Sequence, residues 1–216
     1  RRFKVLITLE GVEGCGKSTH LRLLSEWLTR RGRPHLLTRE PGGTHLGARI
    51  RELLLNPQEE AIDPLCELLL YIADRRQHVA RLLAPDLNAG ELILCDRFTD
   101  ATLAYQGWGR GLDLEMVRRL NALACAGVKP DLTLLLDCAP EEGLARARHR
   151  ADGLGSGAAR EDRFELEELE FHRRVRAGYL ELAAQEPGRI RLIDAGGDVA
   201  GVQEAVRRSV AAAVGL

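Results

Sequence analysis

Short apolar runs alternate with amphipathic stretches along the whole of this chain. The apolar runs predict strands, and they lie at residues 3–9, 34–38, 91–95, 132–136 and 189–193. Apolar residues recur at helical spacing between these runs. This spacing predicts helices at residues 17–30, 46–55, 64–83, 112–126, 140–149 and 163–184, followed by a closing helix.

Nearly continuous apolar strands that alternate with helices are typical of a parallel sheet covered on both faces. We therefore predict an α/β fold with a five-stranded parallel sheet, and a single domain over residues 1–216. Ligands of such sheets bind beyond the carboxyl ends of the strands, so the chemistry is expected there. The glycine-rich stretch at residues 151–159 is too short to separate two domains and predicts a mobile loop.

The charge balance of the chain narrows the possible partners. Lysine and arginine number 31 and aspartate and glutamate 32, for a formal net charge of −1. Proteins dedicated to nucleic acids or to anionic membranes usually carry a basic excess, so neither partner is expected. No apolar run approaches the roughly 18 residues of a membrane-spanning helix. The five cysteines are scattered without a C-x-x-C pair, which favours a reduced, cytoplasmic setting.

A phosphate-binding loop follows the first predicted strand. Residues 11–18 read G-V-E-G-C-G-K-S, which satisfies G-x-x-x-x-G-K-[ST] between a strand and a helix. Backbone N–H groups of such a loop face an anion at the start of the helix. The cradle for the ATP phosphates is therefore expected from Gly11, Val12, Glu13, Gly14, Cys15, Gly16, Lys17, Ser18 and Thr19. Lys17 would reach the β- and γ-phosphates, and the Ser18 hydroxyl would bind Mg²⁺.

The residues after the third predicted strand suggest which reaction the phosphate-binding loop takes part in. Asp96 can hold Mg²⁺ opposite Ser18, and the adjacent Arg97 suits the transfer of a phosphoryl group to a second phosphate. No N-K-x-D guanine motif follows the fourth strand, which weighs against a GTPase switch. A nucleotide-dependent binding or switch protein stays as the alternative of a different class.

Several further motifs fall on the predicted carboxyl edge or on helices near it. They are T-R-E-P-G-G-T at 38–44, Y-I-A-D-R at 71–75, D-R-F at 96–98, A-Y-Q-G at 104–107 and P-D-L-T-L-L-L-D at 130–137. Tyr71 and Arg75 are four residues apart, so one helix face would offer an aromatic ring beside a cation. With the phosphate loop and the arginines near residues 148–163, these motifs resemble the thymidylate kinase family over nearly the whole chain.

The resemblance implies a P-loop nucleoside monophosphate kinase fold with a mobile lid near residues 148–163. It also implies transfer of the γ-phosphoryl group of MgATP to dTMP, giving dTDP and ADP in dTTP biosynthesis, and a homodimer packed through helices. The dTMP pocket implied by the resemblance consists of Glu13, Arg51, Tyr71, Arg75, Arg97, Thr102, Tyr105 and Gln106. A nucleoside monophosphate kinase for another base is the nearer alternative.

Within this pocket the resemblance assigns separate roles. Tyr71 would stack on thymine while Arg75 and Gln106 read its polar edge, and Arg51 and Arg97 would hold the acceptor phosphate. Glu13 and Tyr105 would lie against the deoxyribose. Thr102 would replace a hydroxyl that the family often has at the preceding position, where this chain has Ala101.

The arginine that acts on the donor phosphates is expected in the lid, because the phosphate loop contains none. This matches the bacterial-type subgroup of the family. The R-A-R-H-R run at 146–150 favours Arg150, then Arg148, with Arg163 in reserve. Together with Lys17 and Arg97, Arg150 and Arg148 are the expected catalytic residues. The lid itself is longer than usual, with residues 153–159 apparently inserted.

Overall fold

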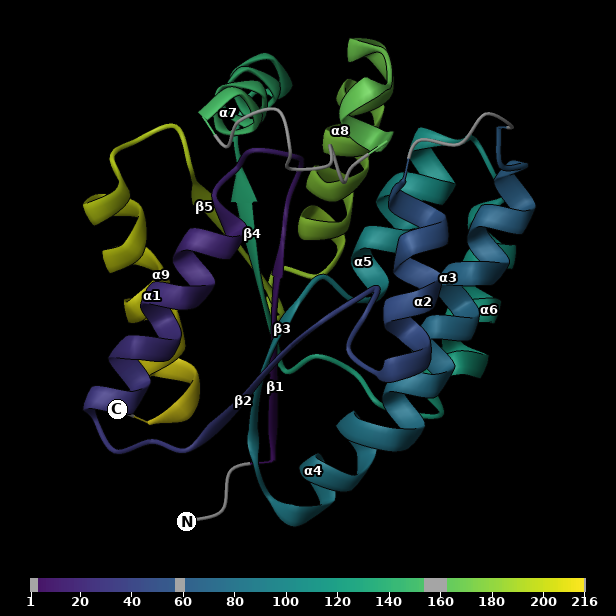
Figure 1. Ribbon diagram of the computed structural model, residues 1–216. Helices are drawn as coiled ribbons and strands as arrows, with labels where there is room; N and C mark the ends of the chain where they lie inside the picture. Colours follow the sequence, from purple (N-terminus) through teal and green to yellow (C-terminus); the bar gives the residue numbers. More distant parts are fainter. Residues whose placement is uncertain (1–3, 57–60, 154–162, 216) are drawn as a thin grey trace.

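A five-stranded parallel sheet forms the centre of the computed structural model, which describes residues 4–56, 61–153 and 163–215 (Figure 1). The strands lie in the order β2-β3-β1-β4-β5, and every neighbouring pair is parallel. Their bounds are β1 Val5–Glu10, β2 His35–Arg39, β3 Leu92–Asp96, β4 Leu132–Asp137 and β5 Ile190–Asp194. The predicted five-stranded parallel sheet is confirmed.

Each strand ends one residue later than its apolar run predicts, and that last residue is charged. The final residues are Glu10, Arg39, Asp96, Asp137 and Asp194. Hydrophobicity stops at the preceding residue, whereas the ladder continues through pairs such as Arg39 with Asp96 and Asp137 with Asp194. The sheet therefore carries a row of charged groups at its carboxyl edge, where ligands of parallel sheets bind.

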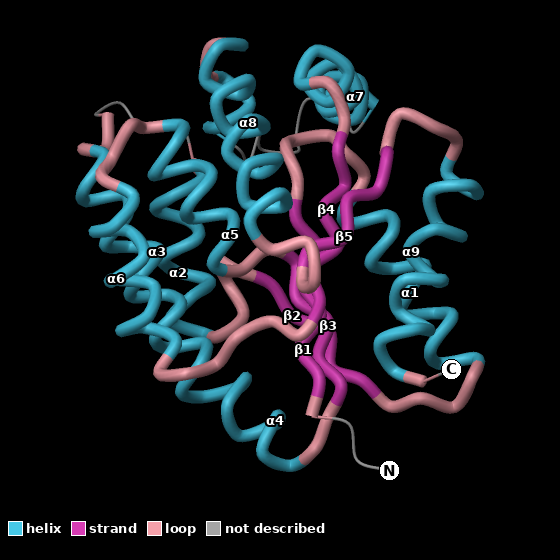
Figure 2. The backbone as a smooth tube through the Cα atoms, turned by 180° about the vertical axis from the view of Figure 1, so that it is seen from behind, coloured by secondary structure: helices cyan, strands magenta, loops and turns pink. Residues whose placement is uncertain are grey.

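Helices cover both faces of the sheet, as Figures 1 and 2 show from opposite sides. α1 (Lys17–Arg30) and α9 (Val199–Val214) lie on one side. The other side carries α2 (His45–Leu55), α3 (Pro64–His78), α6 (Leu114–Cys125) and α8 (Leu169–Gln185). α7 (Pro140–Gly153) lies beyond the carboxyl edge, and α4 (Ala84–Ala89) lies near the opposite edge. None of the helices in the described residues combines the length and the apolar character needed to cross a membrane.

Two π-helical segments depart from the predicted pattern. The predicted helix at 64–83 is α3 followed by the π-helix η1 (Val79–Leu83). A helical stretch that the sequence did not predict joins α5 (Thr99–Thr102) to the π-helix η2 (Leu103–Gly109). Two glycines lower the helix propensity of η2, but tertiary packing needs both. A Cβ on Gly107 would lie 2.4 Å from Leu114, and one on Gly109 would lie 2.7 Å from Phe171.

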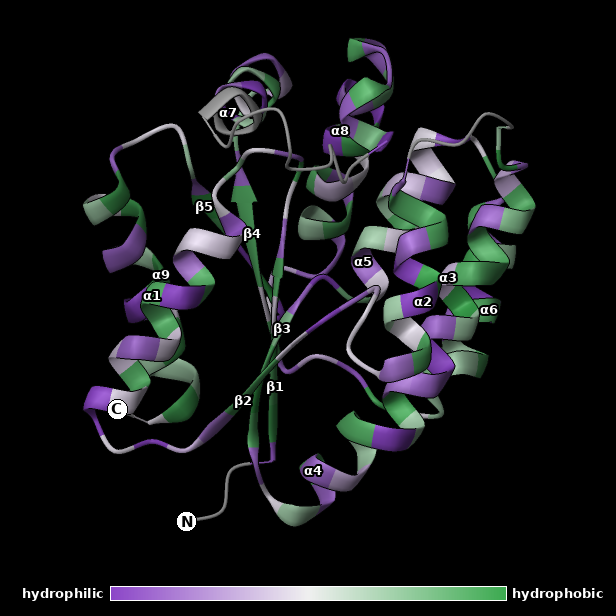
Figure 3. Cartoon of the chain, in the orientation of Figure 1, coloured by the Kyte–Doolittle hydropathy of each residue, from purple (hydrophilic) through white to green (hydrophobic). Residues whose placement is uncertain are grey.

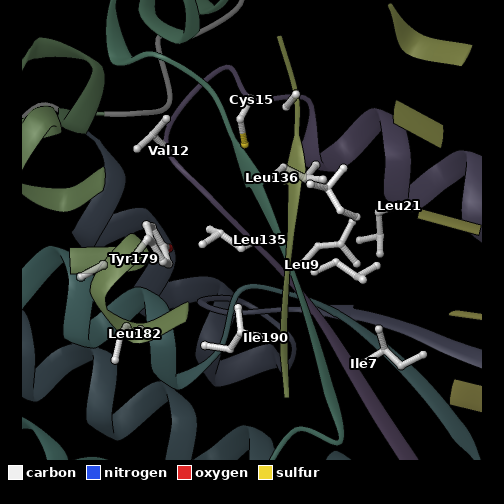
Figure 4. Packing of buried hydrophobic residues seen from close by; sticks show 14 of the residues in the cluster. Ile7, Leu9, Val12, Cys15, Leu21, Leu135, Leu136, Tyr179, Leu182 and Ile190 are labelled. Carbon is white, nitrogen blue, oxygen red and sulfur yellow. The ribbon is translucent and has the colours of Figure 1, made fainter. Parts of the chain in front are cut away.

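The core fills the space between the sheet and the helices on both sides. In Figure 4, Leu9 and Leu136 lie beside Leu21 of α1, whereas Leu135 and Ile190 lie toward Tyr179 and Leu182 of α8. The central strands β1, β3 and β4 are apolar almost throughout, whereas the helices carry both apolar and polar residues (Figure 3). The predicted helix at 163–184 is interrupted, with a 3₁₀ turn η3 (Arg163–Leu166) before α8. Phe164 of the turn and Phe171 of α8 nevertheless both reach the core.

Candidate active site

The phosphate-binding loop connects β1, at the centre of the sheet, directly to α1. Its backbone needs glycine at two positions. Gly11 has φ 138°, and a Cβ there would lie 2.4 Å from the carbonyl oxygen of Leu136. Gly14 has φ 69°, and its Cβ would lie 1.8 Å from the carbonyl oxygen of Gly143 in α7. The loop is thus packed tightly between β4 and the start of α7, with the first N–H groups of α1 beyond it.

The side chains of the loop divide into two groups. Val12 and Cys15 are buried in the core, so only their main chain is available to a phosphate. Ser18 and Thr19 are exposed at the start of α1. Lys17 Nζ donates to the carbonyl oxygens of Gly11 at 3.0 Å and Val12 at 2.8 Å, and approaches Cys15 Sγ at 3.4 Å. These bonds hold the ammonium group beside the loop.

A cavity of about 290 Å³ opens between the phosphate loop and the helices α2 and α3. All eight residues predicted for the acceptor nucleotide line it: Glu13, Arg51, Tyr71, Arg75, Arg97, Thr102, Tyr105 and Gln106. Gly14, Gly16, Lys17, Ser18 and Asp96 line it as well. The cavity therefore joins the predicted donor-phosphate residues to the predicted acceptor residues.

Some predicted residues lie elsewhere. Gly11, Val12, Cys15 and Thr19 of the loop are not part of the cavity wall. Arg148 is exposed on α7. The side chain of Arg150, and most of the predicted lid, lie outside the described residues.

Arg97 stands at the junction of the two halves in a backbone conformation that is rare for arginine. Its φ is 65°, in the left-handed region that costs a residue with a Cβ about 1 kcal/mol. Its guanidinium donates to Glu13 Oε1 at 3.0 Å and to the carbonyl oxygen of Gly11 at 3.0 Å. It also donates to the hydroxyls of Tyr105 and Tyr179, each at 3.1 Å. Strained backbone that the surroundings hold in place is a feature of functional sites.

Glu13 is a buried carboxylate that several donors stabilise. Tyr105 donates to its Oε1 at 2.5 Å, and His172 Nδ1 lies 3.2 Å from its Oε2. Burial alone would raise the pKa of Glu13, but His172, Arg97 and Lys17 outweigh it and lower the pKa to about 2. The side chain is therefore ionised at neutral pH and offers a fixed acceptor for a hydroxyl group.

Arg75 is almost completely buried, with 1% of its surface exposed. Its Nε donates to Glu40 Oε2 at 2.8 Å, and its Nη1 donates to Thr102 and to Asn121. Its Nη2 donates to the carbonyl oxygen of Phe98 at 3.0 Å. A guanidinium has five N–H groups, so the bonds among the described residues leave one N–H on Nη2 for a ligand in the cavity.

The other acceptor residues come from four elements around the same cavity. Tyr71 lies on α3, partly exposed, with its ring also packed against the core. Arg51 of α2 donates to the carbonyl oxygen of Pro41 at 3.1 Å. Thr102 lies at the end of α5, and Gln106 lies in the π-helix η2. Segments far apart in the sequence thus place an aromatic ring, a cation and two neutral polar groups around one space, beside Arg75 and Arg97.

The predicted Mg²⁺ ligands can be tested against the structure. Ser18 and Asp96 both line the cavity. Asp96 Oδ1 is buried and has no hydrogen-bond partner among the described residues. Carboxylate and hydroxyl oxygens are the ligands that Mg²⁺ prefers, so these residues fit the ion.

The cavity also contains residues that sequence reasoning did not assign. They are Arg39, Glu40, Pro41, Leu55, Phe98, Phe164 and Glu165. Arg39, Glu40 and Pro41 belong to the 38–44 motif, whose position after β2 was the available signal. Phe164 and Glu165 carried no such signal. In the acidic stretch at 165–170, Glu165 lines the cavity and Glu167 pairs with Arg110 at 2.6 Å.

Together, these features define a class of protein. A phosphate loop follows the central strand of a five-stranded parallel sheet, and its lysine shares a cavity with buried arginines and an aromatic ring. A switch protein needs no second pocket of this kind. The fold and the site are those of a P-loop kinase that acts on a nucleoside monophosphate.

Comparison with known proteins identifies the family within this class. The thymidylate kinase family model matches residues 9–206. Thymidylate kinase from Trichlorobacter lovleyi is 52% identical over 206 residues, covering 95% of this chain and 96% of that protein. Thymidylate kinase from Syntrophotalea carbinolica is 53% identical over 191 residues, covering 88% of each. The chain belongs to the thymidylate kinase family.

A solved structure supports the same conclusion. The crystal structure of thymidylate kinase from Ehrlichia chaffeensis superimposes with a TM-score of 0.75 at 33% identity. The match covers 95% of this chain and 98% of that one. The predictions of fold class, family and enzyme class are confirmed.

Proposed function

We propose that this chain transfers the γ-phosphoryl group of ATP to dTMP, giving dTDP and ADP, as a step of dTTP biosynthesis. The observation that carries the proposal is the shared cavity. Lys17 and Ser18 of the phosphate loop line the same space as all eight predicted acceptor residues. A donor and an acceptor phosphate chain can therefore meet in one space, as in-line transfer requires.

The acceptor nucleotide is bound through three kinds of contact. Tyr71 stacks on the base, and the remaining N–H of Arg75 donates to a carbonyl oxygen of thymine. Thr102 and Gln106 complete the polar contacts with the base. Glu13 accepts from the 3′-hydroxyl, and Tyr105, held on Glu13, lies along the sugar where a 2′-hydroxyl would otherwise fit.

The acceptor phosphate lies toward Arg51 and Arg97, two forked cations that offset its negative charge. Phosphoryl transfer needs little covalent help from a protein, so positioning and charge stabilisation supply the rate enhancement. Lys17 and Arg97 share the developing charge as an acceptor oxygen attacks the γ-phosphorus in line. Ser18 and Asp96 would hold Mg²⁺. When bound, the ion would supply charge neutralisation on the donor phosphates.

An arginine on or beyond α7 completes the donor side. Arg150 takes this role in the proposal, with Arg148 as the alternative, because both lie on α7, the helix whose first turn packs on Gly14. Arg163 is less suited, since Glu67 and the carbonyl oxygen of Leu54 already hold its guanidinium.

The proposal is tested by a coupled assay of ADP release with ATP and each of dTMP, dUMP, AMP, CMP and GMP. We expect dTMP to be the preferred acceptor. Preference for another monophosphate would favour the kinase of a different base. Failure of dTMP both to bind and to accept a phosphoryl group would favour a nucleotide-dependent switch protein.

We further infer that the protein acts as a homodimer. Five exposed leucines lie on α2, α3 and α6, helices that are far from α1 and α9 (Figure 1). They are Leu46 and Leu53 of α2, Leu65 and Leu69 of α3, and Leu123 of α6, with 43 to 74% of their surface exposed. Apolar surface of this extent favours contact with a second copy. Sedimentation should give a dimer that the double variant Leu53→Glu and Leu69→Glu converts to monomer, whereas Leu192→Glu on β5 should not.

The five cysteines support a reduced, cytoplasmic setting for this reaction. All five are free, and four of them are buried, so none requires oxidation for the fold. Localisation of a tagged full-length chain would test this inference.

A further inference from the structure

Glu67 of α3 is a carboxylate with no exposed surface, and three side chains from two other parts of the chain converge on it. Gln106 Nε2 donates to its Oε1 at 2.7 Å. Arg110 donates to both oxygens, at 3.3 and 3.1 Å. Arg163 donates to Oε2. Neither Glu67 nor Arg110 lines the cavity, so this cluster lies directly behind its wall.

Burying a carboxylate is costly unless cations and hydrogen bonds compensate it. Arg110 and Arg163 supply the charge, and each is fixed by another partner. Arg110 also pairs with Glu167 at 2.6 Å, and Arg163 also donates to the carbonyl oxygen of Leu54. Gln106 is the one uncharged donor among the three side chains, and it is the one that also lines the cavity.

That bond determines which way the Gln106 amide faces. An ionised carboxylate only accepts hydrogen bonds, so the atom of Gln106 beside Glu67 has to be the NH₂ group. The Oε1 atom and the second N–H are then left for other partners, and Gln106 lines the cavity. An amide held in one orientation discriminates between bases with keto and amino edges, whereas an amide free to turn by 180° does not.

We propose that Glu67 is a positioning residue for the acceptor base. It fixes the orientation of the Gln106 amide. Because Glu67 also accepts a hydrogen bond from Arg163, it links that amide to η3, the turn that precedes α8. Phe164 and Glu165, the next two residues after Arg163, themselves line the cavity. One buried carboxylate therefore fixes the relative positions of two separate parts of the cavity wall, η2 and η3. The inference rests on the proposed function, in which this cavity takes dTMP.

The test is a kinetic comparison of the full-length wild type with Glu67→Gln. This variant keeps the shape of the side chain but can present an amide to Gln106. We expect the KM for dTMP to rise about tenfold, the value of one charged hydrogen bond, while the KM for ATP changes less than about twofold. The preference for dTMP over dCMP, as a ratio of kcat/KM values, should fall by about the same factor.

Glu167→Gln is the matched control. It also removes a carboxylate from Arg110 but does not touch Gln106. Its KM for dTMP should stay within about twofold of wild type, as expected for a partly exposed pair. A third comparison introduces Glu67→Gln into a Gln106→Ala background. If Glu67 acts through Gln106, its effect on the KM for dTMP should largely disappear there.

The outcomes separate this inference from the proposed function. Absence of dTMP turnover in the wild type would overturn the function. Turnover in the wild type with equal changes in both KM values, or an undiminished effect of Glu67→Gln in the Gln106→Ala background, would overturn the positioning role alone. If Glu67→Gln does not fold, Glu67→Asp is used in its place. This variant keeps the charge but shortens the side chain by one methylene group. The same comparisons then apply to that variant, with the same expected directions.

Discussion

The two sides of the cavity are built in different ways. Most of the proposed donor side is one continuous segment, the phosphate loop and the start of α1, which offers mainly backbone N–H groups; Asp96 and an arginine of α7 add to it. The acceptor side is assembled from side chains of α2, α3, α5 and η2, several of them buried and held by other buried charges. A short stretch of sequence thus specifies the donor side, whereas the acceptor side depends on the whole fold.

The difference has an energetic basis. A glycine-rich loop needs only space and the correct φ, so its stability depends on close approach to its neighbours. Buried arginines need partners, and Glu40 and Glu67 supply them on the acceptor side. The donor side should therefore be sensitive to added volume, and the acceptor side to lost charge. Substitutions on the two sides and where they meet can test this contrast.

The largest effect is expected at Arg97, where the two sides meet. Arg97→Ala removes a cation from the transferring phosphoryl group and leaves the backbone of the phosphate loop in place. We expect kcat to fall by about a thousandfold, a size typical of losing one transition-state donor. Binding of an ATP analogue, measured by calorimetry, should change little. Unchanged turnover would contradict the role given to Arg97.

A loss of charge on the acceptor side should come next. Glu40→Gln leaves the buried guanidinium of Arg75 without its carboxylate, and breaking such a pair costs about 3 kcal/mol. We expect this decrease in the free energy of unfolding, measured with urea, and a raised KM for dTMP. Glu26→Gln is the control, because Glu26 pairs with Arg22 on the exposed face of α1. Equal stability of the two variants would remove the proposed contrast.

Added volume on the donor side should have a somewhat smaller effect on stability. In Gly14→Ala the new methyl group would overlap the carbonyl of Gly143, so the loop or α7 has to move. We expect a loss of about 2 kcal/mol in the free energy of unfolding, together with a raised KM for ATP. Gly188→Ala provides the comparison, since a Cβ there meets nothing within 4 Å. An increase confined to the KM for dTMP would contradict this prediction.

The last prediction concerns pH and Glu10, at the end of β1, where the effect of each single pH unit is the smallest of the four. Burial and the nearby Asp100 raise the pKa of Glu10 from 4.5 to about 8. Between these values the folded chain keeps a proton that the unfolded chain releases. The free energy of unfolding should therefore fall as the pH rises through this window, by about 1 kcal/mol per pH unit for this one group.

Glu10→Gln, which imitates the neutral acid, removes that titration. The stability of this variant relative to wild type should increase steadily from about pH 5 to about pH 8, as followed by urea denaturation. Glu13 provides the opposite case, because its pKa is lowered to about 2. It contributes stability above pH 4.5 that is lost as the pH falls toward 2. A difference for Glu10→Gln that is independent of pH would contradict the prediction.

The sequence predicted the sheet and most helices because apolar periodicity is a local signal. It missed η2, where packing of Gly107 and Gly109 against Leu114 and Phe171 overrides their weak helix propensity. It also placed the strand ends one residue early, because the last residue of each strand is charged. The local apolar pattern therefore predicted which strands and helices are present better than it predicted where they end.

The candidate site shows the same division. Sequence motifs pointed to the acceptor residues that now line one cavity, but not to the groups that hold them. Glu40 behind Arg75, Glu67 behind Gln106 and Tyr179 behind Arg97 lie 35, 39 and 82 residues from their partners. No local pattern connects residues so far apart. Phe164 and Glu165 were missed for a similar reason, since only the fold brings η3 to the cavity.

The left-handed backbone at Arg97 has a consequence for the history and engineering of this enzyme. Glycine would occupy that position without backbone strain, but it would also remove the four hydrogen bonds of the guanidinium, including the one to the buried Glu13. Relief of about 1 kcal/mol of strain does not offset the loss of a charged partner from a buried carboxylate, so Arg97→Gly should be less stable than wild type as well as inactive. Stability and turnover therefore select the same residue at this position, and a library screened for either property should keep the arginine.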